Sequence, residues 1–484
     1  MTIPGSLWNA KVLRPEQCEV LDGKPCAACA EDIELEKEIR ELERSIEELQ
    51  SRHCALRTVM NENHDHLIQK FPPEIASHIF IQYAPPSVSR YKEERSTPLR
   101  LGAVCRKWRQ LAWATPQLWS SLVVEVTALG EHPLQLIAEW LERSGCLPLT
   151  IRFDHSDKGQ VRVYPELTKI LNKHSARWYD MYLEMPVDHL HHLSGSSQGN
   201  ILRRLTLRHP ISNPARSKIS TFSMTTKPHL TDLTLLSVGL PCVDITWNNL
   251  TVASLYDIDV EECLELIRQA PFLQILRLQL INTSSGVFLV PNFTRIVHPH
   301  LRSLELRQIE KTISYFRILD SLCLPSLEQW LYDFCPVYLE ETMIPFMGHL
   351  SSLKIFKINI DHYLCCQVIR MLSHLSSLES LELRSVYASY VIKELLDLLF
   401  NPAQSPLFLP RLRSLELVYG LPFPWESLPR IFASSRGQSL RVKVYTQPDC
   451  HDTVDKTANL ILELVDKGFD LSVDAFYKYE EWNC

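Results

Sequence analysis

Residues 378–383 read Leu-Glu-Ser-Leu-Glu-Leu, which is an anchor leucine followed, after two residues, by a pair of alternating leucines. In an extended strand, successive side chains point to opposite faces. Leu381 and Leu383 therefore share one face, and Glu382 points to the other. The phrase predicts a short strand with one buried face and one exposed face.

The same phrase, L-x-x-L-x-L, recurs along most of the chain, and its anchors mostly follow one another at 20 to 28 residues. This is the period of leucine-rich repeats, whose strands and helices stack because one repeat cannot bury its apolar side alone. Segments with helical spacing separate several copies, at 261–270, 365–375 and 390–399. We expect an α/β fold with an irregular leucine-rich-repeat solenoid over residues 133–475, and an ordinary parallel α/β domain is the alternative. Clear copies have anchors at Leu202, Leu230, Leu273, Leu301, Leu378 and Leu412, and weaker copies at Trp178, Leu250, Leu327 and Leu353.

The residues between the alternating leucines would line the concave face of such a solenoid. Their charges have both signs, so this face lacks a basic stripe for nucleic acid and suits a protein partner. Plain solvation of exposed strand positions is the alternative for any one of them. The residues expected to contact a protein target are Arg277, Glu305, Arg307, Asp333, Lys357, Glu382 and Arg384.

Residues 31–63 carry a heptad pattern, because one set of side chains recurs at alternating spacings of four and three. An average repeat of 3.5 residues is typical of a coiled coil. In a parallel homodimer Glu38 would face Glu43 of the second copy, and Arg52 would face Arg57, so both pairs would repel. An antiparallel pair would set the acidic first half against the more basic second half. We expect a coiled-coil helix that either dimerises through residues 35–60 or folds back on its own chain. The seam comprises Leu35, Ile39, Leu42, Ile46, Leu49, His53, Leu56 and Met60.

Residues 64–125 predict a small all-α module. Pro72 and Pro73 open a helix, because the first helical positions need no backbone N–H. After a loop over 83–98, residues 101–111 place apolar side chains on one helical face. Residues 115–119 then form a turn into a short helical or irregular piece. Residues 1–30 contain three prolines and no periodicity, which predicts an unstructured leader.

Three phrases in this module resemble the F-box-like module of the large fungal F-box family: FPPEIASHIF at 71–80, LGAVCRKWRQLA at 101–112 and TPQLWSSL at 115–122. The resemblance implies docking onto a Skp-type adaptor and, through it, onto the cullin scaffold of an SCF-type ubiquitin ligase. Phe71 stands where the family prefers leucine, and the loop between the two helices is long, which bears on how the second helix meets the adaptor. For Ile79 and Trp108, a place in the core of the module is the alternative. The implied adaptor contacts are Pro72, Pro73, Glu74, Ile75, Ile79, Phe80, Val104, Cys105 and Trp108.

Composition narrows the class of protein further. Hydrophobic residues make up 45% of the chain and the formal net charge is −7, which favours a folded chain and disfavours binding to nucleic acid or anionic membranes. No apolar run approaches the roughly 20 residues that span a bilayer. The first residues lack the apolar stretch of a secretory signal, and the 14 cysteines are scattered. We therefore expect reduced thiols and a cytoplasmic or nuclear location.

The catalytic and metal-binding motifs are incomplete. The G-x-S-x-G match at 195–199 follows a histidine-rich segment, whereas a nucleophile elbow follows a strand. Cys26 and Cys29 have metal-ligand spacing without a second pair nearby, and the histidines at 189, 191 and 192 lack H-E-x-x-H spacing. We expect no enzymatic activity, no catalytic residue, no metal and no cofactor.

These features predict a substrate-recognition subunit, in which the helical module binds a Skp-type adaptor and the repeats bind an unidentified protein target. The alternative is a protein-interaction scaffold without a role in ubiquitin transfer. Co-purification with the adaptor separates the two hypotheses.

Overall fold

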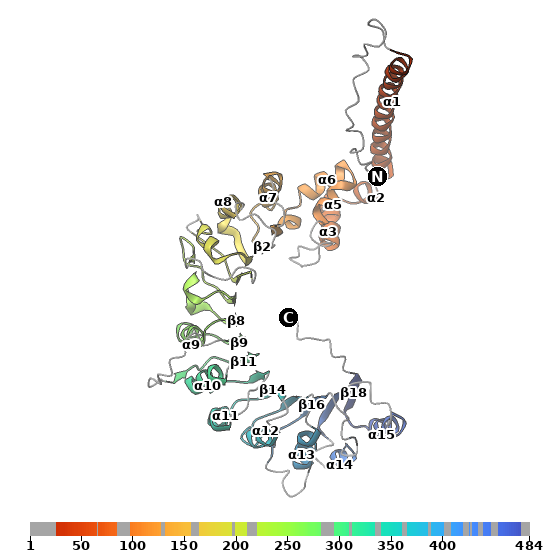
Figure 1. Cartoon of the computed structure of the whole chain (residues 1–484). Coiled ribbons are helices and arrows are strands. Elements are labelled where there is room, and N and C mark those ends of the chain that lie inside the picture. The colour runs from red at the N-terminus through yellow and green to blue at the C-terminus, as the bar shows by residue number, and fades with distance from the viewer. Residues whose placement is uncertain are drawn as a thin grey trace. The chain divides into compact units, whose positions relative to one another are not determined.

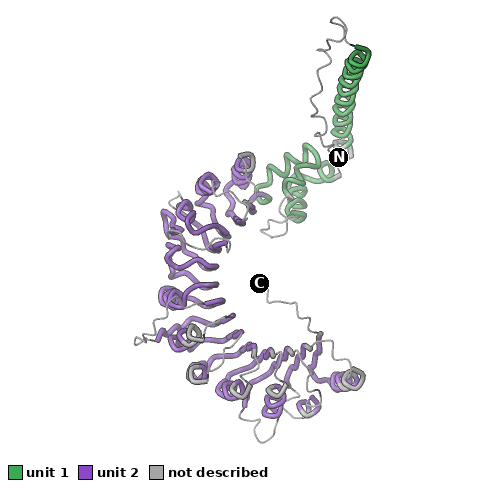
Figure 2. The backbone as a smooth tube through the Cα atoms, in the orientation of Figure 1, with its two compact units in different colours: residues 1–86, 91–118 green, residues 87–90, 119–484 purple. Residues whose placement is uncertain are grey.

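The computed structural model describes residues 26–64, 66–84, 97–126, 131–155, 164–195, 199–210, 220–281, 295–308, 312–333, 340–360, 365–385, 389–400, 408–419, 425, 428–433, 439–446 and 454–475. The chain divides into two compact units, shown in separate colours in Figure 2. Unit 1 comprises residues 1–86 and 91–118, and unit 2 comprises residues 87–90 and 119–484.

The described part of unit 1 is helical. Residues 1–25 of the predicted unstructured leader lie outside the described residues, and residues 27–30 are helical, contrary to the prediction. A helix of 38 residues comes first and covers the predicted coiled-coil segment. Shorter helices and a 3₁₀ turn follow, whereas residues 121–125 of the module that was expected to be all-α form part of a strand. The elements are α1 (Ala27–His64), α2 (His66–Lys70), α3 (Pro73–Tyr83), α5 (Thr97–Val104), α6 (Arg106–Trp113) and η2 (Pro116–Trp119).

The single helix expected over 101–111 is in fact two helices, because the chain breaks at Cys105. This residue adopts an extended conformation (φ −156°, ψ 174°), and its Sγ accepts the backbone N–H of Trp108 at 3.4 Å. The thiol therefore takes the capping role that serine or aspartate usually fills. The two helices are joined across the break, because Arg109 Nε on α6 donates to the carbonyl of Gly102 on α5 at 2.8 Å. A Cβ atom at Gly102 would lie only 2.1 Å from the Trp113 ring. Glycine is thus required where α5 packs against α6.

The described residues of unit 2 are built on a parallel sheet of 14 strands, in which the order of the strands follows the order of the chain. Two further two-stranded sheets pair β5 with β7 and β10 with β12. The strands are β1 (Ser121–Val126), β2 (Leu149–His155), β3 (Trp178–Glu184), β4 (Arg204–Arg208), β5 (Phe222–Ser223), β6 (Asp232–Leu236), β7 (Val243–Asp244), β8 (Val252–Tyr256), β9 (Ile275–Gln279), β10 (Ile296–Val297), β11 (Ser303–Arg307), β12 (Leu322–Cys323), β13 (Gln329–Tyr332), β14 (Ile355–Ile360), β15 (Ser380–Ser385), β16 (Ser414–Tyr419), β17 (Arg441–Thr446) and β18 (Leu471–Ala475).

Helices connect many of the strands, and Figure 1 shows α9 to α13 along one side of the sheet. The predicted helices at 261–270, 365–375 and 390–399 correspond to α9, α12 and α13, with small differences at their ends. The helices of unit 2 are α7 (Glu131–Arg143), α8 (Tyr164–Asn172), α9 (Val260–Gln269), α10 (Thr312–Ser321), α11 (Glu340–Gly348), α12 (Cys365–Leu372), α13 (Ser389–Phe400), α14 (Leu428–Ala433) and α15 (Val454–Asp466), and its 3₁₀ turns are η4 (Ser175–Arg177), η5 (Val187–His192), η6 (Leu240–Cys242) and η7 (Trp247–Asn249).

The register of the sheet explains the repeated phrase. Leu276 pairs with Leu304, which pairs with Trp330, and each of these side chains is at most 1% exposed. The second alternating position forms a parallel buried column that includes Leu278 and Leu306. Every copy of the phrase thus adds one strand and two rungs to a continuous apolar core.

Successive repeats also share an irregular backbone feature. In the described part of the chain, β6, β8, β9 and β11 are each followed at once by a residue with φ between 48° and 54°. These residues are Ser237, Asp257, Leu280 and Gln308. A left-handed conformation is uncommon outside glycine and asparagine. Because this conformation recurs directly after four strands, the chain makes the same kind of turn at the end of each of them.

Candidate functional site

Helix α3 has two apolar stripes on different faces. It begins at Pro73, directly after the expected opening proline, Pro72, at φ −54°. One stripe, Ala76, Phe80 and Ala84, is at most 4% exposed and faces the interior of unit 1. The other, which we name the exposed α3 stripe, has the same spacing of four residues and is 38% to 67% exposed. It consists of Phe71, Ile75, Ile79 and Tyr83.

The buried stripe holds α3 against α6. The rings of Phe80 and Trp108 lie 4.8 Å apart at 45°, and Ala112 on α6 is fully buried. Beyond the end of α6, the hydroxyl of Thr115 donates to the carbonyl of Leu111 at 2.7 Å and lies 3.1 Å from the Ser77 hydroxyl. The ring contact and the hydrogen bond between Thr115 and Ser77 together hold α3 in place. The exposed α3 stripe therefore lies on a helix whose opposite side is packed.

The predicted adaptor residues therefore separate into two groups. Phe80 is only 1% exposed, so its expected role as a contact is corrected to one in the core of the unit. Cys105 and Trp108 are half-buried, and the cap and the ring contact described above account for their positions. The predicted contacts that are exposed are Pro72, Pro73, Glu74, Ile75, Ile79 and Val104. Phe71 and Tyr83 are also exposed and continue the four-residue spacing, although neither was among the predicted contacts.

A second candidate surface lies on the sheet of unit 2. One outward row runs in register across neighbouring strands, from Arg277 on β9 through Glu305 and Leu331 to Lys357 and then Glu382 on β15. Four of the seven expected target residues, Arg277, Glu305, Lys357 and Glu382, therefore lie in one row across neighbouring strands. Adjacent strands lie about 4.8 Å apart, which brings their charges within pairing distance.

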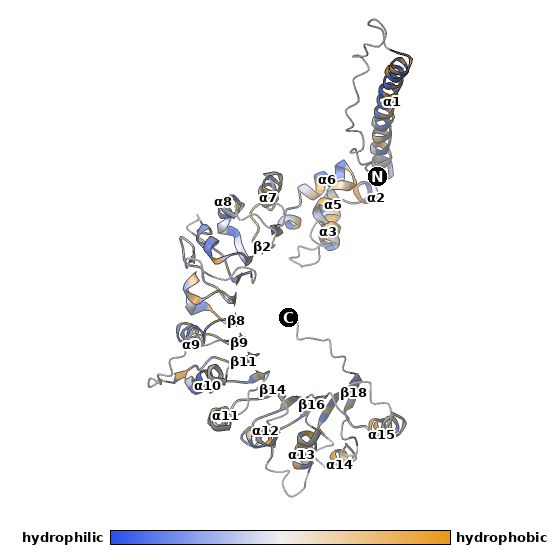
Figure 3. Cartoon of the chain, viewed as in Figure 1, coloured by the Kyte–Doolittle hydropathy of each residue, from blue (hydrophilic) through white to orange (hydrophobic). Residues whose placement is uncertain are grey.

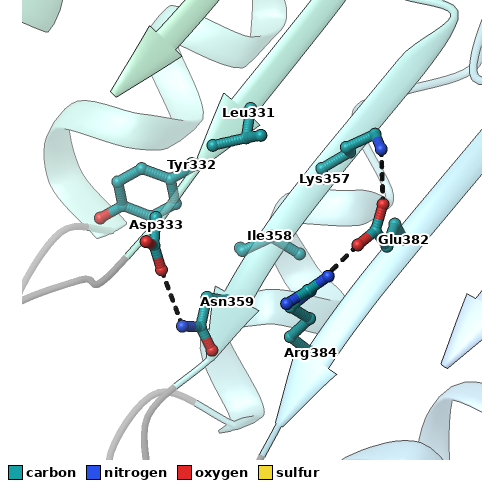
Figure 4. Close-up of a pocket in the computed structure, with 8 residues that line it drawn as sticks. All are labelled: Leu331, Tyr332, Asp333, Lys357, Ile358, Asn359, Glu382 and Arg384. Atoms are coloured by element: carbon teal, nitrogen blue, oxygen red, sulfur yellow. Dashed lines mark hydrogen bonds and ion pairs between the residues drawn. The ribbon is translucent and has the colours of Figure 1, made fainter. Parts of the chain in front are cut away.

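The charges in this row bind one another. Lys357 Nζ lies 2.7 Å from one carboxylate oxygen of Glu382, and Arg384 Nε donates to the other at 3.0 Å (Figure 4). We name Lys357, Glu382 and Arg384 the charged sheet cluster. Beside it, Asn359 donates to Asp333 at 2.7 Å. Glu382 is 5% exposed, so its expected role as a direct target contact is corrected to one of positioning two cations.

A similar group lies on β9 and β11. Glu305 is 3.6 Å from Arg277 and 3.3 Å from Arg307, so here too one carboxylate lies between two cationic side chains. The hollow lined by the charged sheet cluster and its neighbours has a volume of only about 10 Å³, which is room for about one water molecule. The arrangement is a broad surface with fixed charges and suits a protein partner better than a small ligand.

Glu416 on β16 lies in register beside Glu382. Burial raises the pKa of the Glu416 carboxyl, and the charge of Glu382 raises it further. Lys443 on the following strand acts in the opposite direction. The two carboxylates thus have opposite effects on the stability of the fold. The charge of Glu382 is stabilised by two cations, whereas the charge of Glu416 is destabilised by burial and by repulsion from Glu382.

We expect Glu416→Gln to stabilise the chain at pH 7 and Glu382→Gln to destabilise it by about 1–2 kcal/mol. The pKa of Glu416 is raised in the folded chain above its usual value of 4.5. The stability of the folded chain therefore falls as the pH rises from 4.5 through this raised pKa. The gain from Glu416→Gln should therefore shrink at pH 4. Urea unfolding of both variants at the two pH values measures the effects. Changes of the same sign at pH 7 would contradict the assignment.

The remaining chemical motifs do not assemble into a centre within the described residues. The middle of the G-x-S-x-G match, 196–198, lies outside them. The ring of His189 packs 4.8 Å from that of Tyr164, and burial, followed by the charge of His192, lowers the pKa of His189. In the described ranges no three histidine, cysteine or acidic side chains are grouped so as to hold a metal ion. The same ranges contain no helix with the length and apolarity to cross a bilayer.

Comparison with known proteins assigns one part of the chain. The search of curated proteins finds no relative. Among solved structures, a Bacteroides fragilis protein determined by the Northeast Structural Genomics Consortium is similar, with 16% identity and a TM-score of 0.29. That match covers 51% of this chain, and the chain spans 65% of the length of that protein. Residues 68–125 match the F-box-like family. The chain therefore contains an F-box-like domain, and the whole exposed α3 stripe lies within it.

Proposed function

We propose that the chain is the substrate-recognition subunit of an SCF-type ubiquitin ligase. The observation that carries this proposal is the exposed α3 stripe within the F-box-like domain. Four large apolar side chains at a spacing of four residues form a ready docking face, and such residues are preferred anchors of protein interfaces. A Skp-type adaptor, joined to a cullin scaffold, is the partner that F-box domains generally bind.

The sheet of unit 2 would then hold the target. Fourteen parallel strands in chain order, the shared turn after several of them and the repeated phrase support a leucine-rich-repeat solenoid. Its outward rows carry the charged sheet cluster and the arginine pair around Glu305. Because these side chains already bind one another, less conformational entropy is lost when a partner contacts them.

In this proposal the chain contributes proximity and is not itself an enzyme. Binding an adaptor at one unit and a target at the other converts a bimolecular encounter into an effectively unimolecular one. The covalent steps of ubiquitin transfer would belong to other subunits. Neither a metal nor a cofactor has a part in this role, and we place it in the cytoplasm or the nucleus.

Affinity capture from a native extract tests the proposal. The wild-type chain should bring down a Skp-type adaptor, a cullin and a target protein together. The Ile79→Asp variant should lose the adaptor and the cullin and keep the target, because the substitution is confined to the docking face. Capture of other partners by the wild-type chain, without an adaptor, would instead favour the scaffold hypothesis.

A further inference from the structure

Helix α1 leaves its whole apolar seam exposed. The side chains of Leu35, Ile39, Leu42, Ile46 and Leu49 are 50% to 62% exposed, and Leu56 and Met60 are 55% and 58% exposed. Elsewhere α1 is mainly hydrophilic, as the blue ribbon in Figure 3 shows. An isolated helix gains most of its stability by packing an apolar face. This seam therefore requires a partner surface of matching length.

The charges on α1 are divided between its halves. Residues 31–48 contain nine acidic and three basic side chains, whereas residues 49–64 contain two arginines and one glutamate. The ion pairs described within the helix, Lys37–Glu34 at 3.4 Å and Arg40–Glu36 at 3.7 Å, are exposed and lie in the acidic half. They leave that half strongly negative. A second copy of the same helix supplies the complementary charge only when it runs in the opposite direction.

One antiparallel register pairs every residue of the seam. Leu35 then packs against Met60 of the second copy, Ile39 against Leu56, Leu42 against His53, and Ile46 against Leu49. In this register the flanking residue Glu36 faces Arg57 of the second copy, and the two-fold symmetry gives this attractive pair twice. A parallel register places Glu36 beside Glu31 and Arg57 beside Arg52, which repel.

We propose that two copies of the chain associate through α1 as an antiparallel coiled coil in this register. The rise of 1.5 Å per residue places the two copies of His64 about 50 Å apart, at opposite ends of the pair. The F-box-like domain follows α1 in each chain. The dimer therefore carries two adaptor-docking faces that leave from opposite ends, so both can be occupied at once.

The molar mass of the full-length chain as a function of concentration tests the proposal. Sedimentation equilibrium should show a dimer, and Ile46→Asp, which buries two carboxylates at the centre of the pair, should give a monomer at every concentration. Glu41→Arg, on the outer face of α1, is the matched control for a change of charge and should leave the dimer unchanged. Circular dichroism reports whether each variant keeps its folded content.

Charge exchange tests the direction of the helices. Glu36→Arg and Arg57→Glu should each raise the dissociation constant of the dimer about tenfold, because each turns two attractive pairs into repulsive ones. The double variant should restore most of the wild-type affinity, because the pairs between the two chains re-form with exchanged signs while only the exposed Arg40–Glu36 pair within each helix is lost. A parallel dimer would instead be strengthened by Glu36→Arg, which would overturn the proposal. A monomeric wild-type chain would also overturn the proposal, and it is the result expected if residues 1–25 cover the seam.

Discussion

Replacement of Ile79 by aspartate should weaken binding of a Skp-type adaptor by about 100-fold and leave the F-box-like domain folded. Ile79 is 38% exposed, so a charge at this position remains hydrated in the free chain. In the complex the same carboxylate would be buried against the adaptor without a partner, which is costly. Titration calorimetry with purified full-length chain and adaptor measures the change in dissociation constant.

Two controls separate the docking face from the fold. Ile79→Val keeps the apolar surface and should retain affinity within about threefold, because a single methylene is lost. Gln110→Asp makes a similar change of charge at an exposed position of α6 and should leave binding unchanged. A dissociation constant for Ile79→Asp within threefold of wild type would show that the exposed α3 stripe is not the adaptor surface.

Trp330→Ala should lower the free energy of unfolding of unit 2 by about 4 kcal/mol, the largest effect on stability that we expect of a single substitution. Trp330 on β13 is 1% exposed, and its ring lies 5.0 Å from that of Phe356 on the next strand and 5.2 Å from that of Phe346 on α11. Alanine would leave a cavity where the strand and helix layers meet.

The matched variant Trp330→Phe should cost less than about 1.5 kcal/mol. Among the described residues the buried Nε1–H of Trp330 has no acceptor, so phenylalanine keeps the aromatic contacts and removes an unsatisfied donor. Urea unfolding followed by circular dichroism compares the two variants. Equal losses for alanine and phenylalanine would mean that the indole N–H, and not the packed ring, carries the stability.

The strands were the most predictable part of the fold. Each of the ten copies of the phrase coincides with a strand, from Trp178 on β3 to Leu417 on β16. The alternation of leucines is sufficient because only one face of a strand can enter the core. Strands β1, β2, β17 and β18 lack the phrase because their buried positions hold residues such as Ile151, Phe153, Val442 and Val444. The sheet accordingly begins at Ser121, before the expected start at residue 133.

The site was predictable in its location and less so in its details. The opening of α3 by proline follows from local chemistry, but the burial of Phe80 depends on Trp108, which lies 28 residues later. The break at Cys105 was missed because cysteine is a rare helix cap. Pairing within the charged sheet cluster depends on the register between β14 and β15. A single strand does not reveal which residues lie beside it.

Hydrogen exchange of the full-length chain, with and without a Skp-type adaptor, shows whether the exposed α3 stripe is the surface that binds the adaptor. We expect slower exchange over residues 71–83 and around Val104 when the adaptor is bound, with strands β9 to β16 unchanged. Unchanged exchange in α3, or protection concentrated on the sheet, would contradict this expectation.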